Sequence, residues 1–230
     1  MNEIFENSVY FGVLISLISY GIGMILKNKF KSAIFTPMLV AVVIIIVVLL
    51  GCNISYDVYY EGAKYLSYLL TPTTVCLAVP LYEQLTLLKS NLKAIILGIA
   101  SGAITSLVSI LIMAIIFGLD HKMYVTLLPK SITVAIGMGV SEGLGGYVTI
   151  TVSIIAITGV LGNIIAETVC KVFKIDEPIA KGVALGTASH AIGTAKALEM
   201  GEVEGAMSSL SIAVAGLLTV VGASVFAQFL

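Results

Sequence analysis

Arginine and tryptophan are both absent from this chain of 230 residues, and charged residues make up only 11% of it. Globular domains carry about 25% charged residues, whereas 59% of this chain is hydrophobic and its mean hydropathy is +1.10. A formal net charge of −1 excludes electrostatic nucleic-acid binding as a main activity. The apolar runs are continuous and do not alternate as barrel strands do. The composition therefore predicts an all-α integral membrane protein embedded in the lipid bilayer.

Motifs for cofactors, metals and catalysis are also missing from the sequence. Cys52, Cys76 and Cys170 show no CxxC spacing, which favours packed thiols over a metal or disulfide framework. No Walker motif, dinucleotide fingerprint, HExxH or GxSxG is present. Ser189 and His190 are adjacent in the chain, so they do not face each other as a nucleophile and its base must. We therefore expect no cofactor, no metal and no catalytic residues, and we expect that the protein is not an enzyme.

Stretches without Lys, Arg, Asp or Glu divide the chain. Five of them are long enough to cross about 30 Å of hydrocarbon, and they cover 7–26, 32–56, 94–119, 143–166 and 205–230. A sixth, 65–82, contains two prolines. Two shorter gaps, 131–141 and 182–195, are rich in glycine and hydroxyl residues. Such short polar segments reach membrane depth only where protein or a polar cavity surrounds them.

We therefore predict about six spanning helices and two broken or re-entrant helices, at 125–142 and 178–200. The whole chain, 1–230, is expected to be one transmembrane domain. Within it, 7–56 would be a two-helix scaffold and 57–230 a transport-like core.

Lysine positions predict the orientation of these segments. Lys27, Lys29 and Lys31 lie between the first two predicted spans, which places that loop in the cytoplasm and the N-terminus outside. The lysine-rich loop 171–181 is expected in the cytoplasm by the same rule. The two broken elements then enter from opposite faces, and each precedes a long helix. This is the pattern of an inverted-topology repeat, with a site where the two tips meet.

The second broken element carries most of the candidate site residues, which are Ser189, His190, Gly193, Thr194, Lys196 and Glu199. His190 could be a satisfied core residue bonded to Thr187 or Thr194. It could instead take up a proton and follow a substrate anion or a proton gradient. Lys196 and Glu199 are i,i+3 neighbours on a helix, so they could form a structural ion pair or take part in function.

The first broken element supplies the other candidates. Pro129 is suited to a helix start, and Ser131 and Thr133 follow it in the first turn. A half-helix that begins mid-membrane presents free N–H groups and a positive dipole end, which suits a carboxylate. Lys130 could add a full positive charge, or it could extend to the lipid headgroups from an ordinary capped helix.

Several motifs give the chain a family resemblance. They are ALGTASHAIGTAKALEMGEVEGAMSSLS (184–211), PKSIT (129–133) with VSEGLGG (140–146), and TPTTVCLAVPLYEQ (71–84). In this order they resemble the LrgB/CidB family over nearly the whole chain. The matching positions point to Ser131, Thr133, Ser189, His190, Gly193, Thr194 and Glu199. The chain departs from the family pattern at Val134 and Ala135, where threonine and proline are common, and at Lys196, where arginine is frequent.

The resemblance implies a multi-pass protein of the bacterial cytoplasmic membrane, paired with a smaller holin-like LrgA/CidA-type partner. The family is described as antiholin-like, and it is also similar to the membrane portion of the plant chloroplast glycolate/glycerate translocator. We therefore hypothesise a homodimeric transporter of small monocarboxylates such as pyruvate or glycolate, coupled to protons. The alternative is a regulatory partner of a holin-like protein that controls murein hydrolase activity and lysis.

Overall fold

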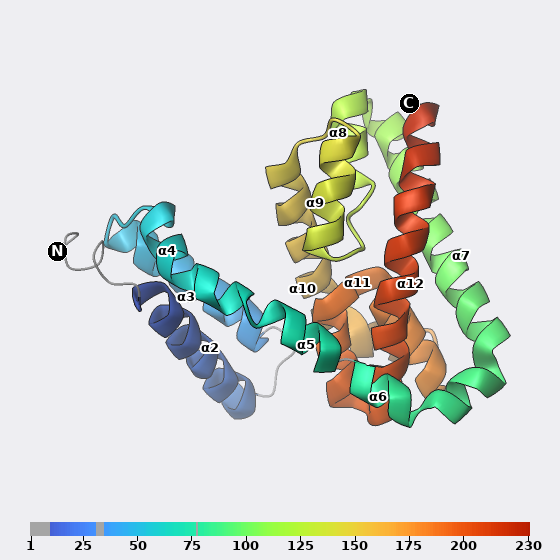
Figure 1. Cartoon of the computed structure of the whole chain (residues 1–230), viewed down its shortest axis with the longest axis horizontal. Helices are drawn as coiled ribbons and strands as arrows, with labels where there is room; N and C mark the ends of the chain where they lie inside the picture. The colour runs from blue at the N-terminus through green and yellow to red at the C-terminus, as the bar shows by residue number, and fades with distance from the viewer. Residues whose placement is uncertain (1–9, 31–34, 77) are drawn as a thin grey trace. The chain divides into compact units, whose positions relative to one another are not determined.

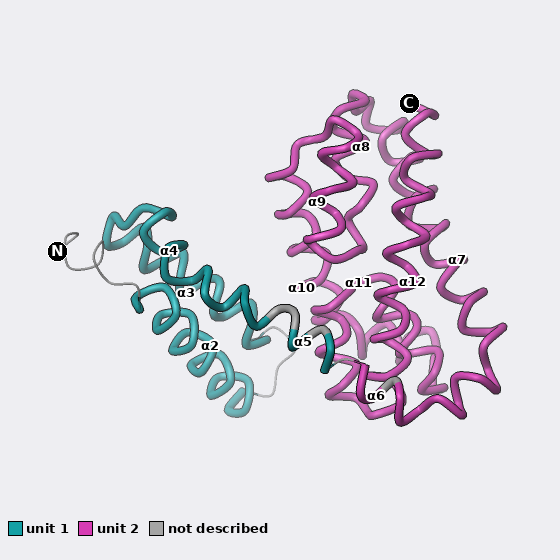
Figure 2. The backbone as a smooth tube through the Cα atoms, viewed as in Figure 1, with its two compact units in different colours: residues 1–76 teal, residues 77–230 magenta. Residues whose placement is uncertain are grey.

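The computed structural model describes residues 10–30, 35–76 and 78–230, without the side chains at positions 70, 71, 74 and 81. All regular structure in these ranges is helical, which confirms the predicted all-α class. The chain forms two compact units, residues 1–76 and residues 77–230 (Figure 2). The proposed division into a scaffold and a transport core at residue 56 is a functional expectation and stays a prediction.

Unit 1 consists of α2 (Phe11–Phe30), α3 (Pro37–Gly51), α4 (Tyr56–Ser67) and α5 (Leu70–Cys76). Helix α2 packs against both α3 and α4. Two glycines on α2 permit this close approach, because a Cβ on Gly12 would collide with the backbone of Tyr59 and one on Gly23 with that of Pro37. A hydrogen bond of 2.9 Å between the hydroxyls of Ser16 and Tyr59 joins α2 to α4.

Unit 2 consists of α6 (Ala78–Glu83), α7 (Leu85–Phe117), α8 (His121–Leu127), α9 (Val134–Gly143), α10 (Val148–Val172), α11 (Pro178–Met200), α12 (Glu202–Phe226) and the short 3₁₀ helix η1 (Ala227–Phe229). Three of these, α7, α10 and α12, are long. Figure 1 shows α8 and α9 beside the end where α7 and α12 finish, and α11 at the other end. Gly118 ends α7 in the left-handed conformation, with φ 61°.

Helices α8 and α9 form the first hairpin (residues 121–143), whose tip is the segment 129–133. A hydroxyl network on α10 holds the two helices together. The Thr151 hydroxyl lies 2.9 Å from the carbonyl oxygen of Thr126 on α8 and 2.7 Å from the Ser141 hydroxyl on α9. The Tyr147 N–H donates to the Thr126 hydroxyl at 2.8 Å. These bonds satisfy polar groups that would otherwise be buried without partners.

Helix α11 is broken at His190, where φ is 43° and ψ is −139°. The two arms, 178–189 and 191–200, fold back on each other and form the second hairpin (residues 178–200). Leu185 and Ala197 pack in one cluster with Ala166 of α10, although a straight helix would separate residues 185 and 197 by about 18 Å. The predicted break in this segment is confirmed, and so is the break in the first one.

Helix α10 runs past both hairpins and brings their tips together. Its first half packs against α9, and the Ile155 side chain fills the space left by Gly137. The Ile155 carbonyl oxygen lies 3.0 Å from Nε2 of His190. The two broken elements therefore enter unit 2 from opposite ends and meet at one turn of α10, as an inverted arrangement requires.

The spanning helices differ in number from the prediction. Among the described residues, α2, α7, α10 and α12 with η1 are long and apolar enough to cross a membrane. Helix α3 has 15 residues and reaches only about 22 Å, because Thr36 caps its start and Asn53 turns the chain after it with φ 52°. The expected sixth span, 65–82, is divided among α4, α5 and α6.

We expect Thr151→Val to loosen the first hairpin. The change keeps the side-chain shape but leaves Thr126 and Ser141 without their shared partner. Loss of a buried hydrogen-bond partner costs about 1–3 kcal/mol, so the melting temperature in detergent should fall. Ser153→Ala on the same helix is the control, since its exposed hydroxyl contacts only the carbonyl of Thr149. Equal melting temperatures for the two variants would contradict the proposed role of the network.

Candidate functional site

One face of α7 is polar or small along most of its length. Its members are Asn91, Gly98, Ser101, Gly102, Thr105, Ser106 and Ser109. Their positions differ by combinations of three, four and seven residues, so they share one side of the helix. From residue 91 to residue 109 this stripe extends about 27 Å. We call it the α7 stripe.

A cavity of about 740 Å³ lies against the α7 stripe. Its other walls come from the tip of the first hairpin and from the first arm of the second hairpin, including Lys130, Ser131 and Thr187. Apolar residues such as Ile95 and Val183 complete the lining. The size is typical of a small-molecule site, where a few polar groups in an apolar wall orient the ligand.

Lys130 supplies the positive charge of this cavity. Its ammonium group donates to the Ser131 hydroxyl at 2.9 Å. The Ser131 hydroxyl lies 3.2 Å from that of Ser106 on α7, which joins the hairpin tip to the stripe. In the described ranges, no Asp or Glu forms an ion pair with Lys130. A half-buried ammonium beside two hydroxyls is therefore available to an anion.

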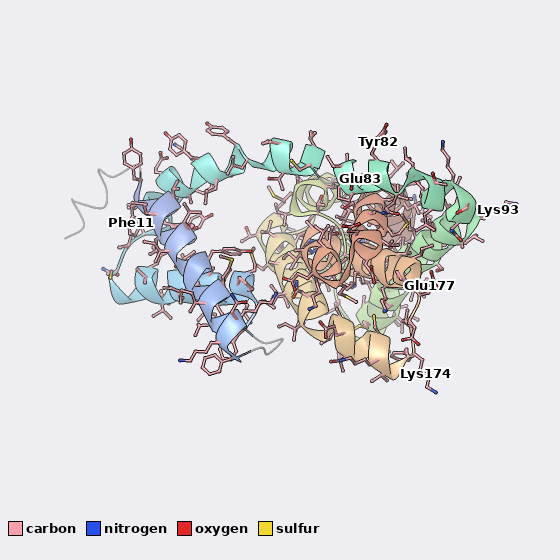
Figure 3. The ribbon with its side chains drawn as sticks, turned by 90° about the horizontal axis from the view of Figure 1, so that it is seen from below. Phe11, Tyr82, Glu83, Lys93, Lys174 and Glu177 are labelled. Carbon is pink, nitrogen blue, oxygen red and sulfur yellow. The ribbon has the colours of Figure 1, made fainter. Side chains whose placement is uncertain are left out.

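The two ends of the cavity differ in polarity. Asn91 and the exposed Glu177 lie at one end. Figure 3, seen from below, labels Glu177 together with Lys93 and Lys174 on the same side of unit 2. Beyond Ser109, α7 enters an apolar cluster with α8 and α12. The cavity thus extends from the lysine-bearing end of unit 2 and stops below an apolar layer.

His190 does not line this cavity. Its side chain is 3% exposed and points to α10, where Nε2 lies 3.0 Å from the Ile155 carbonyl oxygen. The ring occupies space that a side chain at Gly159 would fill. Of the hydroxyl partners considered from the sequence, Thr194 bonds the His190 backbone oxygen at 3.1 Å. The imidazole therefore fixes the position of the hairpin tip against α10.

The other candidates of the second hairpin lie at helix contacts. Ser189 packs where Gly162 of α10 has no side chain. Gly193 sits against the carbonyl of Leu185, where a Cβ would be 2.7 Å away. The Thr194 hydroxyl is 2.7 Å from that of Ser208 on α12. None of the three candidates lines the cavity, so their contacts hold the two arms and their neighbours in register.

Lys196 forms a stronger ion pair than the sequence indicated. Its ammonium lies 2.6 Å from Oε1 of Glu167 on α10 and 3.5 Å from Oε2 of Glu199. The predicted pair with Glu199 exists, and the pair with Glu167 ties the second arm to α10. In the first hairpin, Thr133 is the N-cap of α9 without a side-chain capping bond, and it does not line the cavity.

Sequence reasoning missed the α7 stripe, and it considered Thr187 only as a possible partner of His190 and not as part of a cavity wall. All of the stripe except Asn91 lies within 94–119, which the sequence analysis treated only as an apolar span. Plotting the hydroxyl residues and glycines of that span at helical spacing would have placed Ser101, Thr105 and Ser109 on one face. As for metals, no group of three or more His, Cys, Asp or Glu side chains in the described ranges could hold an ion.

We expect His190→Gly to give a more stable protein than His190→Ala. Both changes remove the bond to Ile155, but only glycine adopts φ 43° without strain. Unfavourable backbone conformations cost about 1–3 kcal/mol, so the glycine variant should melt at the higher temperature. Ala188→Gly in the helical first arm is the control and should lower the melting temperature. If His190→Ala is as stable as His190→Gly, the backbone at position 190 is not strained and the prediction is wrong.

Comparison with known proteins shows which family the chain belongs to. The LrgB-like family matches residues 16–229. The chain is 41% identical to the antiholin-like protein LrgB of Bacillus mycoides (strain KBAB4) over 222 residues, which is 96% of each chain. It is 40% identical over the same length to the proteins of that name from Bacillus cereus (strain B4264) and Bacillus anthracis (strain CDC 684 / NRRL 3495). No solved structure matches the chain. On these matches, and with helices that can cross a membrane, the chain belongs to the LrgB-like family of membrane proteins.

Proposed function

We propose that this protein moves small monocarboxylates across the bacterial cytoplasmic membrane and that a proton gradient drives the movement. The observation that carries the proposal is the cavity of about 740 Å³ with Lys130 and Ser131 at the hairpin tip. Two broken helices whose tips meet between long helices are a common basis for carrier sites. The proposed topology places the N-terminus outside and the lysine-bearing end of unit 2 in the cytoplasm.

The charges of the cavity favour a small anion with one carboxylate. An ammonium group and two hydroxyls can donate to carboxylate oxygens, and charge-assisted hydrogen bonds are stronger than neutral ones. Among the described residues that line the cavity, Lys130 is the only cation. A second carboxylate on the ligand would face apolar residues or approach Glu177 at the mouth. Apolar lining residues such as Ile95 on α7 and Val183 on α11 suit a short carbon chain.

Protein reconstituted in liposomes should take up labelled pyruvate, lactate or glycolate when a pH gradient is applied. We expect Lys130→Met to reduce this uptake about 10- to 100-fold, because it removes a charged donor worth about 1.5–3 kcal/mol. Lys122→Met is the matched control: this lysine lies over the Tyr147 ring at 4.2 Å and is not part of the cavity. It should leave uptake unchanged.

Two results would count against transport by this site. If none of the three acids enters liposomes that contain the folded wild-type protein, transport of monocarboxylates is refuted. If uptake occurs but Lys130→Met and Lys122→Met behave alike, the cavity is not the route.

A second candidate function is regulatory, and the names of the relatives favour it. The similar Bacillus proteins are named antiholin-like. In this alternative the chain pairs with a smaller holin-like protein of the LrgA/CidA type and controls murein hydrolase activity and lysis. A homodimer is proposed for the transporting form. Assembly with a partner would depend on lipid-facing helix surfaces, and the cavity beside Lys130 would have no direct part in it.

The two functions are separable by complementation. The test uses a strain that lacks the protein and is supplied with Lys130→Met. If the function is regulatory, this variant should restore normal lysis control, because Lys130 lies in the cavity and not on a surface used for assembly. If the function is transport, the variant should restore neither uptake nor lysis control. Lysis timing and uptake would be measured in the same cells, with Lys122→Met as the control. Co-purification of an LrgA/CidA-type protein with both variants would show that assembly is intact.

A further inference from the structure

A buried hydroxyl without a partner lies in the wall of the cavity. Thr187, on the first arm of the second hairpin, is 6% exposed and contributes to the lining. Its Oγ1 is enclosed and has no hydrogen-bond partner, one of two such side-chain atoms among the described residues. The other, in Ser19, belongs to α2 and lies outside any cavity wall described above. A buried polar group left unpaired is unfavourable, so it calls for a functional reason.

The position of Thr187 relates directly to the anion cradle formed by Lys130, Ser131 and Ser106. The Thr187 methyl group rests where Gly102 has no side chain. Gly102 and Ser106 are one turn apart on α7, a rise of about 6 Å. A carboxylate held at the cradle would therefore have its second and third carbon atoms near Thr187. Threonine adopts more than one rotamer in a helix, so a change of rotamer can exchange the positions of the Thr187 hydroxyl and its methyl group.

We propose that Thr187 determines specificity by bonding an oxygen on carbon 2 of the carried acid. This assignment rests on the proposed transport function and adds a residue to it. The hydroxyl can donate to a keto oxygen and can donate to or accept from a hydroxyl group. An acid with only hydrogen on carbon 2 leaves Thr187 unpaired. Sites built to bond a polar group discriminate against analogues that lack it.

Lactate and propionate form a matched pair of probes, because they differ only by the hydroxyl on carbon 2. Their uptake would be measured separately in liposomes that contain wild-type protein, Thr187→Val or Thr187→Ser. Wild-type protein should favour lactate. Thr187→Val keeps the shape of the side chain and should lower the lactate-to-propionate ratio about tenfold, as expected for the loss of one hydrogen bond. Thr187→Ser should restore most of the preference.

The melting temperatures of the same variants serve as the control for correct folding. Replacing an unpaired buried hydroxyl by a methyl group should leave the melting temperature of Thr187→Val unchanged or raised. A lowered melting temperature with an unchanged ratio would show that the hydroxyl has only a structural partner, and it would overturn the assignment. An unchanged ratio in a stable variant would overturn it as well. If wild-type protein carries neither acid nor pyruvate or glycolate, the proposed transport function itself fails.

Discussion

Backbone hydrogen bonding at the break in α11 is the constraint on which unit 2 depends. A helix interrupted among apolar neighbours exposes N–H and C=O groups that only protein or trapped water can satisfy. Around His190 two backbone oxygens find side-chain partners: the Thr194 hydroxyl bonds the His190 oxygen, and Asn163 donates to the Ile192 oxygen at 3.0 Å. A third bond joins the imidazole of His190 to the Ile155 oxygen of α10. Two of the three join the break to α10. The second hairpin is thus inseparable from the helix that also holds the first.

Polar side chains on the long helices serve two different purposes. On α10 and α12, hydroxyl and amide groups are enclosed and bonded to the hairpins, as in the pairs Thr151–Ser141 and Thr194–Ser208. On α7, Ser101 bonds its own helix at the Gly98 oxygen and still faces the cavity. The first kind fixes the arrangement of helices. The second kind leaves a polar surface that the helix fold does not use.

Much of this architecture could be predicted from the sequence, because membrane segments obey simple length and polarity rules. The gaps 131–141 and 182–195 were too short and too polar to span, and both proved to be broken. Side-chain direction could not be predicted in the same way. His190 and Thr187 are three residues apart, yet the turn at φ 43° sends the ring to α10 while Thr187 stays on the cavity wall. Likewise, Glu167 is 29 positions before Lys196, so only the fold reveals their pairing.

The apolar layer above the cavity has a consequence for electrical forces. From Ser109 to the end of α7 at Phe117 the helix rises about 12 Å, whereas a full hydrocarbon core measures about 30 Å. If water fills the cavity, the membrane voltage drops mainly across this thin layer, and the local field is more than twice that in the surrounding lipid. A voltage of 100 mV corresponds to about 2.3 kcal/mol for one elementary charge. Nearly all of that energy would then act on an anion during a single short step past Ile110 and Ala114.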